Sequence, residues 1–127
     1  MCGIAGIITT FRKEQNELNH YVNVMNDLQK HRGPDAQNVW VNSECNVAFG
    51  HVRLSIIGLD SGAQPMSNNS GNTICFNGEI YNYIDLKKEL SNDYTFLTNS
   101  DTEVILASYE KWGEDCVTHL RGMFAFT

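Results

Sequence analysis

Cys2 is the residue whose position most clearly suggests chemistry. A chain that starts Met1-Cys2-Gly3 is expected to lose Met1, because the second residue is small. Cys2 would then carry both a thiol and a free α-amino group, and such an amine titrates at about 7.7–8.0, so part of it is neutral at physiological pH. An N-terminal nucleophile activated by its own amine can carry out acyl transfer. Alternatively, a cysteine at position 2 has no catalytic role.

A histidine could also activate the thiol. His51 is the only plausible base among the four histidines, because His20 lies on the polar side of a predicted helix and the other two stand at a helix end and near a turn. His51 falls in a predicted strand, and this favours a packed or hydrogen-bonded structural role over a Cys–His dyad. The remaining cysteines lie among apolar residues and are interpreted as small buried side chains: Cys45, Cys75 and Cys116.

Composition limits the possible partners. The 127 residues carry a formal net charge of -6 with scattered Lys and Arg, so no basic surface for nucleic acid is expected. No apolar run approaches the ~20 residues that span a bilayer, and the N-terminus lacks the basic region of a secretory signal. We therefore expect a cytoplasmic protein without a nucleic-acid or membrane partner. The cysteine spacing predicts no zinc or redox motif, because no pair forms Cys-x-x-Cys.

The elements that would position Cys2 follow from apolar periodicity. Helices are predicted at 14–30, 83–90 and 100–112, the last opened by a capping box at Ser100–Glu103 and ended by Gly113, with a helical turn at 116–120. Residues 58–72 are expected to form a loop. Strands or extended segments are predicted at 2–8, 39–41, 47–49, 53–57, 73–76, 94–97 and 123–126. The strand 73–76 should stop at Asn77-Gly78, a dipeptide suited to positive φ. Because strands outnumber helices and do not alternate with them, the predicted class is α+β.

Seven motifs, in order along nearly the whole chain, resemble the class II glutamine amidotransferases of the asparagine synthetase type. They are MCGIAG at 1–6, HRGPD at 31–35, GHVRLSII at 50–57, QPM at 64–66, FNGEIYNY at 76–83, SDTEVI at 100–105 and RGMFAF at 121–126. One departure is Gly58, where such proteins often carry Asp. The resemblance implies an N-terminal-nucleophile hydrolase fold, with two antiparallel β-sheets between helical layers. It also implies that residues 1–127 are an amidotransferase domain truncated at its C-terminal side.

The resemblance further implies hydrolysis of L-glutamine to glutamate and ammonia through a thioester on Cys2. Arg53 would bind the substrate α-carboxylate, a task that suits a bidentate guanidinium. Asn77 and Gly78 would stabilise the oxyanion, and Glu79 and Asp101 would face the substrate ammonium. Without the resemblance, Arg53 would be interpreted as a surface cation, Asn77-Gly78 as a turn and Asp101 as part of a helix cap.

The remaining implications concern the pocket wall and the partners. The main chain of Leu54, Ser55, Ile56 and Ile57 would line the glutamine pocket, whereas the HRGPD motif is interpreted as a structural turn. No cofactor is expected on this chain. ATP and Mg²⁺ would bind to an absent synthetase domain of the same full-length protein, which would pass the ammonia to ATP-activated aspartate. A homo-oligomer is possible, since missing strands would leave sheet edges and an apolar face uncovered.

Two other functions stay open. A retained Met1 would remove the basic amine of Cys2 and favour a non-catalytic regulatory or interaction remnant of the fold. Another acceptor for the ammonia, such as a sugar or an antibiotic precursor, is the second alternative, because the absent domain sets the acceptor.

Overall fold

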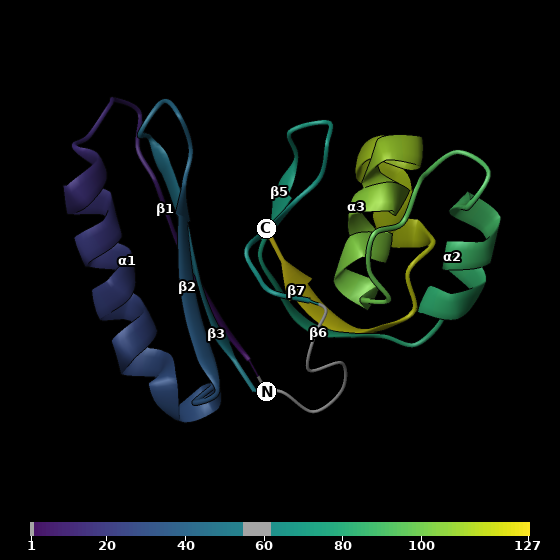
Figure 1. The fold of residues 1–127 in the computed structure, drawn as a ribbon, viewed down its shortest axis with the longest axis horizontal. Helices are drawn as coiled ribbons and strands as arrows, with labels where there is room; N and C mark the ends of the chain where they lie inside the picture. The colour runs from purple at the N-terminus through teal and green to yellow at the C-terminus, as the bar shows by residue number, and fades with distance from the viewer. Residues whose placement is uncertain (1, 55–61) are drawn as a thin grey trace.

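Helix α1 (Gln15–Gln29) covers one face of a three-stranded antiparallel sheet (Figure 1). The computed structural model describes residues 2–54 and 62–127. The strands of this sheet are β1 (Gly3–Ile8), β2 (Ala36–Val41) and β3 (Val47–Arg53), with β3 in the centre. The helix at 14–30 and the strands at 2–8, 39–41 and 47–49 were thus predicted correctly, and the 3₁₀ helix η1 (Lys30–Arg32) follows α1.

Three residues of α1 are buried against the sheet: Leu18, Val22 and Asn26. Leu18 and Val22 are fully buried beneath the helix and meet Ala48 of β3. At Gly50 the helix approaches the strand so closely that an added Cβ would lie 2.5 Å from Val22 Cγ1. The central strand β3 therefore has small residues on the face that packs against α1, and its larger side chains lie on the opposite face.

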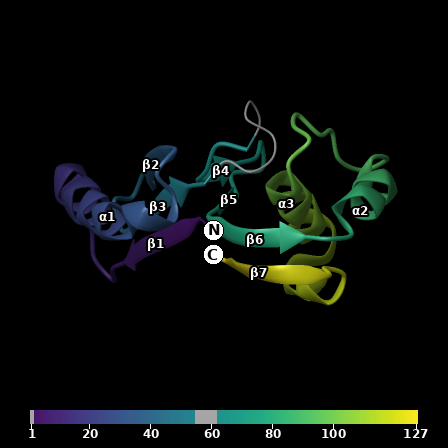
Figure 2. The same ribbon diagram turned by 90° about the horizontal axis from the view of Figure 1, so that it is seen from below.

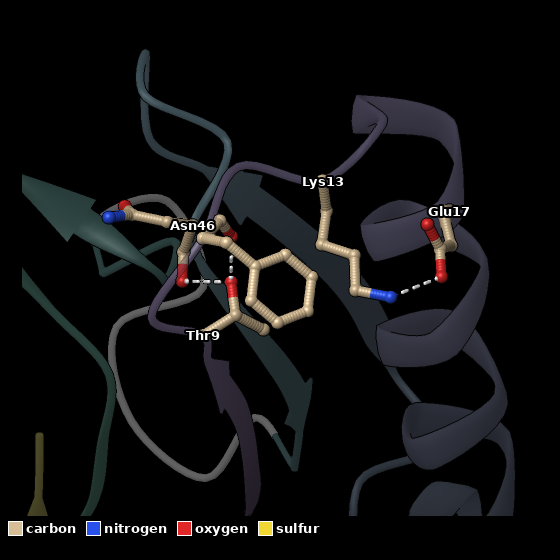
Figure 3. A network of polar contacts seen from close by, with 5 residues as sticks. Thr9, Lys13, Glu17 and Asn46 are labelled. Carbon is tan, nitrogen blue, oxygen red and sulfur yellow. Dashed lines mark hydrogen bonds and ion pairs between the residues drawn. The ribbon is translucent and has the colours of Figure 1, made fainter.

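The turn between β1 and α1 is fixed by polar contacts (Figure 3). Thr9 Oγ1 lies 2.7 Å from Phe11 O and 3.3 Å from Asn46 O, so it can donate to either carbonyl. Lys13 Nζ forms an ion pair with Glu17 at 2.7 Å in the first turn of α1. These contacts lie at the end of the sheet opposite Cys2.

The second half of the molecule is built around helix α3 (Asp101–Trp112). Seven consecutive residues of α3, from Thr102 to Ser108, are buried. The helix packs against helix α2 (Tyr83–Leu90) and against the antiparallel pair β6 (Phe76–Ile80) and β7 (Gly122–Phe126), which run side by side in Figure 2. A small hairpin of β4 (Met66–Ser67) and β5 (Thr73–Ile74) and the 3₁₀ helix η2 (Gly113–Thr118) complete this half.

The three-stranded sheet and the β6–β7 pair lie between α1 on one side and α2 and α3 on the other (Figure 1). Hydrogen bonds join them: His51 Nε2 lies 3.2 Å from Phe76 O, and Cys75 Sγ donates to Gly50 O at 3.2 Å. Strand β1 also contacts β6. The predicted class, α+β with antiparallel sheets, is confirmed. None of the described helices is both long and apolar enough to cross a bilayer.

Several predicted elements differ from the structure. Asn77-Gly78 does not end a strand, because β6 continues to Ile80 by pairing with β7. Residues 62–72 include β4, which pairs with β5, so the predicted loop is not wholly irregular. Of the predicted extended segment 53–57, Arg53 is the last residue of β3, while residues 55–61, Gly58 among them, lie outside the described part.

The segment 94–97 forms no strand, because a buried carboxylate replaces a strand partner. Glu103 accepts hydrogen bonds from Leu97 N at 2.8 Å and Thr98 N at 2.6 Å. The predicted capping box is therefore only half formed. Ser100 Oγ accepts from Thr102 N at 3.1 Å as an N-cap, but Glu103 turns to the preceding loop.

Candidate active site

Cys2 lies beside the end of the central strand. Because Gly3 pairs with Val52, Cys2 extends past the last ladder position and reaches Leu54. Leu54 N donates to Cys2 Sγ at 3.5 Å, and the thiol lies 3.9 Å from Leu54 O. The side chain is half-buried. The nucleophile candidate thus sits at the junction of β1, β3 and the segment that follows β3.

The HRGPD motif, interpreted as a structural turn, fixes the main chain around Cys2 and Arg53. Arg32 Nε donates to Cys2 O at 3.2 Å, and Asp35 N donates to Arg53 O at 3.0 Å. Gly33 lies so close to β3 that an added Cβ would be 2.5 Å from Arg53 N. The motif therefore supports two predicted site residues at once. This role of Arg32 was not predicted, although Arg32 belongs to the HRGPD motif.

The Arg53 guanidinium is directed to the N-terminus of α3. Arg53 and His51 alternate along β3 and therefore share the face that points toward the second sheet. A Cβ built on Gly62 would lie 3.8 Å from Arg53 Nη2 and 3.3 Å from Ser100 Oγ. Arg53 and Ser100, the residue that precedes Asp101, thus approach the same backbone position. A guanidinium and a helix N-terminus are both groups that bind carboxylates.

The backbone N–H and C=O of Gly78 point away from β7. Cys75 and Thr127 exchange both backbone hydrogen bonds, and Tyr81 N donates to Arg121 O at 2.7 Å, so the odd-numbered residues of this ladder are the hydrogen-bonded ones. Gly78 pairs with Phe124 at a non-hydrogen-bonded position. Its N–H and C=O therefore point to the edge of β6 that carries no other strand in the described chain. Asn77 is the neighbouring residue and is half-buried.

Two carboxylates complete the set of charges. Asp101 Oδ2 accepts from Ile80 N at 3.0 Å, so the start of α3 is bonded to the end of β6. Burial raises the pKa of Asp101 above its ordinary value of 3.8, the hydrogen bonds from Ile80 and Thr102 oppose this, and the charge of Glu79 raises the pKa further. A cation bound near Asp101 and Glu79 would favour the ionised form of both carboxyl groups.

His51 is suited to a structural role, as predicted. Its side chain is 1% exposed, and its Nε2 lies 3.2 Å from Phe76 O. Burial lowers its pKa, the bond to Phe76 raises it, and the charge of Arg53 lowers it. Cys45, Cys75 and Cys116 are buried free thiols, also as predicted. Burial raises the pKa of Cys75 to about 12, so this thiol is unreactive.

The predicted pocket wall is only partly described. Leu54 contacts Cys2, whereas Ser55, Ile56 and Ile57 lie outside the described residues. Within residues 2–54 and 62–127, no three His, Cys, Asp or Glu side chains are placed to hold a metal ion. The described groups offer the Cys2 thiol, the Arg53 guanidinium, two carboxylates and outward-facing amides, a set that fits a small zwitterion with a reactive carbonyl.

Comparison with known proteins identifies the family of this chain. The model of the family described as glutamine amidotransferase domain matches residues 1–127. The chain belongs to this family. It is 45% identical to glutamine-hydrolyzing asparagine synthetase 3 of Bacillus subtilis (strain 168), over 99% of this chain and 21% of that protein. It is 39% identical to asparagine synthetase B (glutamine-hydrolyzing) of Escherichia coli (strain K12), over 99% of this chain and 22% of that protein.

Membership of the glutamine amidotransferase domain family does not fix the acceptor of the nitrogen. The chain is also 38% identical to amidase chry2 of Gibberella zeae, over 99% of this chain and 20% of that protein. The chain thus spans about a fifth of the length of these three relatives.

Proposed function

We propose that this chain hydrolyses L-glutamine to glutamate and ammonia with Cys2 as the nucleophile. The observation that carries the proposal is the separation of charges around the end of β3. Arg53 lies near the start of α3, Asp101 and Glu79 lie at β6, and the Cys2 thiol lies at Leu54. Glutamine has the matching pattern of an α-carboxylate, an α-ammonium and a γ-amide.

The proposed mechanism begins once Met1 has been removed. The free amine of Cys2 takes the thiol proton, and the thiolate attacks the γ-carbonyl carbon of glutamine. Asn77 Nδ2 and Gly78 N–H donate to the resulting oxyanion, each such donor contributing about 3–4 kcal/mol to transition-state stabilisation. The amine returns the proton to the leaving nitrogen, so that ammonia departs and a γ-glutamyl thioester remains. A water molecule then hydrolyses the thioester, giving glutamate and the free thiol.

Substrate orientation is assigned to the charged residues. Arg53 pairs with the α-carboxylate through its two parallel N–H groups, and Asp101 and Glu79 accept from the α-ammonium. The main chain of Leu54 and of residues 55–57 lines the pocket. The finer fold assignment that fits this chemistry is the N-terminal-nucleophile hydrolase type, and the order of helix, two sheets and helices supports it.

The proposed use of the ammonia is asparagine synthesis. The support is the similarity to glutamine-hydrolyzing asparagine synthetases, which are much longer than this chain. ATP, Mg²⁺ and aspartate would bind to a synthetase domain elsewhere in the full-length protein. A second candidate is an amidotransferase for another acceptor, and the similarity to amidase chry2 favours keeping it.

Two measurements test the glutaminase proposal. The intact mass of the purified protein should lack Met1, because an amide nitrogen at Cys2 could not serve as the base. Cys2→Ala should abolish glutamine hydrolysis but leave ammonia-dependent synthesis by the full-length enzyme. Cys45→Ser is the matched control, since Cys45 is a thiol in the turn at the opposite end of β3. Normal glutamine use by Cys2→Ala would refute the assignment.

A further inference from the structure

Gln64 is a buried polar residue that joins three elements of the fold. Its side chain is 7% exposed. Its Oε1 accepts from Phe76 N at 2.6 Å, and its Nε2 donates to Thr102 Oγ1 at 3.3 Å. Its carbonyl oxygen accepts from Asn38 Nδ2 at 3.0 Å. Gln64 therefore connects β2 of the first sheet with β6 and α3 of the second half.

The bond to Phe76 acts on the strand that carries the proposed oxyanion donors. Phe76, Gly78 and Ile80 all turn their N–H groups to the same edge of β6, because alternate positions of the ladder face alternate sides. Gln64 occupies the N–H of Phe76, and Asp101 occupies that of Ile80. The N–H of Gly78 lies midway between these two fixed points, so its direction depends on both.

The bond to Thr102 acts on the proposed ammonium site. Thr102 follows Asp101 in the first turn of α3, and its own N–H is held by Ser100 Oγ at 3.1 Å. The Thr102 side chain is 2% exposed, so its hydroxyl cannot readily exchange Gln64 for bulk solvent. One planar amide group thus links the residue before Asn77 to the residue after Asp101.

We propose that Gln64 is a positioning residue. It fixes β6, the strand that carries the proposed oxyanion donors, relative to the start of α3, which carries Asp101. This inference rests on the proposed glutaminase function. The two hydrogen bonds of the amide act mainly on different groups. The bond from Gln64 Oε1 holds β6 next to Gly78 and therefore acts mainly on kcat. The bond from Gln64 Nε2 places Asp101 and therefore acts mainly on KM, with a smaller effect on kcat through the bond of Asp101 to Ile80.

The test compares variants that remove one or both hydrogen bonds of the Gln64 side-chain amide. Gln64→Met keeps the size of the side chain but loses both bonds, and kcat should fall by about 10- to 100-fold, as misplaced catalytic groups do. Thr102→Val removes only the hydrogen bond from Gln64 Nε2, and KM should rise by about two- to tenfold, the range of one hydrogen bond, with a smaller fall in kcat than in Gln64→Met. Thr102→Ser restores the hydroxyl and should restore KM. The KM effects of Gln64→Met and Thr102→Val should not add, because both remove the same bond.

A control separates positioning from stability. Val22→Ala creates a cavity beneath α1 in the other half of the molecule, and it should lower the melting temperature but leave kcat and KM unchanged. If Gln64→Met behaves like Val22→Ala while Cys2→Ala abolishes hydrolysis, Gln64 only stabilises the fold and the inference is wrong. If Gln64→Met does not fold, the Thr102→Val and Thr102→Ser pair decides, and equal KM values for both refute the inference. If the wild-type protein does not hydrolyse glutamine, the proposed function fails first and this inference fails with it.

Discussion

Substitution of Gly78 by Ala should damage both the β6–β7 pair and the proposed oxyanion site. A Cβ on Gly78 would overlap Met123 O and would lie 2.6 Å from Phe124 Cα and 2.8 Å from Phe124 Cβ. Carbon atoms normally meet at about 3.5–4.0 Å, so the two strands would have to separate by about 1 Å. The residue also has a φ of 153°, which L side chains rarely adopt.

The expected loss of stability follows from these two costs. Overpacking typically costs about 1–3 kcal/mol, and an unfavourable backbone conformation costs about 1–3 kcal/mol. Together they give about 2–6 kcal/mol, a large share of the 5–15 kcal/mol that stabilises a typical domain. Glutamine hydrolysis should be lost as well, because the N–H of Gly78 moves with the strand.

Gly71 provides a matched control for this prediction. Gly71 also has a positive φ, 85°, but an added Cβ there would meet no atom within 4 Å. Gly71→Ala should therefore show the backbone cost without the overpacking, and hydrolysis should continue. Urea unfolding measures the stability of both variants, and a glutaminase assay measures their activity. Equal losses of stability, or normal kcat/KM in Gly78→Ala, would refute the reasoning.

Three further predictions concern charged groups. Asp101→Asn should raise KM for glutamine by about 10- to 100-fold, the value of a hydrogen bond to a charged group. In the native protein, KM should rise as pH falls through the raised pKa of Asp101, because protonation removes the attraction for the ammonium, and this pH dependence should be absent from Asp101→Asn. Because the pKa of Asp101 is higher in the folded protein than its ordinary value of 3.8, ionisation of Asp101 lowers the free energy of unfolding as pH rises from 3.8 through the folded-state pKa. Arg53→Lys retains the charge but loses the bidentate geometry, so kcat/KM should fall by at least about tenfold, and an unchanged value would return Arg53 to a non-catalytic role. Glu103→Gln should cost about 1–3 kcal/mol in urea unfolding, since the buried carboxylate accepts two backbone N–H groups, whereas Glu110→Gln, at an exposed position, should change little.

Local patterns predicted the helices well because their signals are local. The periodicity of the helix at 14–30 and the Ser100 N-cap both describe interactions within a few residues, and both are confirmed. The strand at Gly78 was mispredicted because Asn-Gly favours a turn by local preference. Pairing with Phe124, 46 positions later in the chain, decides its conformation instead.

The candidate site shows the same division. Motif resemblance named the charged residues, and the structure brings Arg53 near the start of α3 and Asp101 onto β6. The supporting bonds of Gln64 and Arg32 were not predicted, because they join segments that only the tertiary fold brings together. Both residues belong to motifs, QPM and HRGPD, but a sequence motif does not show which atoms its residues contact in the fold.

The alternation of N–H groups along β6 also bears on how the molecule meets other extended chains. A strand added to an open sheet edge needs a continuous row of free donors and acceptors. On this edge of β6, Gln64 and Asp101 side chains occupy the N–H groups of Phe76 and Ile80, and His51 occupies the carbonyl of Phe76. An incoming peptide would find the N–H of Gly78 between two blocked positions. Among the described residues, the side chains of Gln64, Asp101 and His51 therefore make this edge of β6 unsuitable for β-augmentation, as proline or lysine does on other exposed strands.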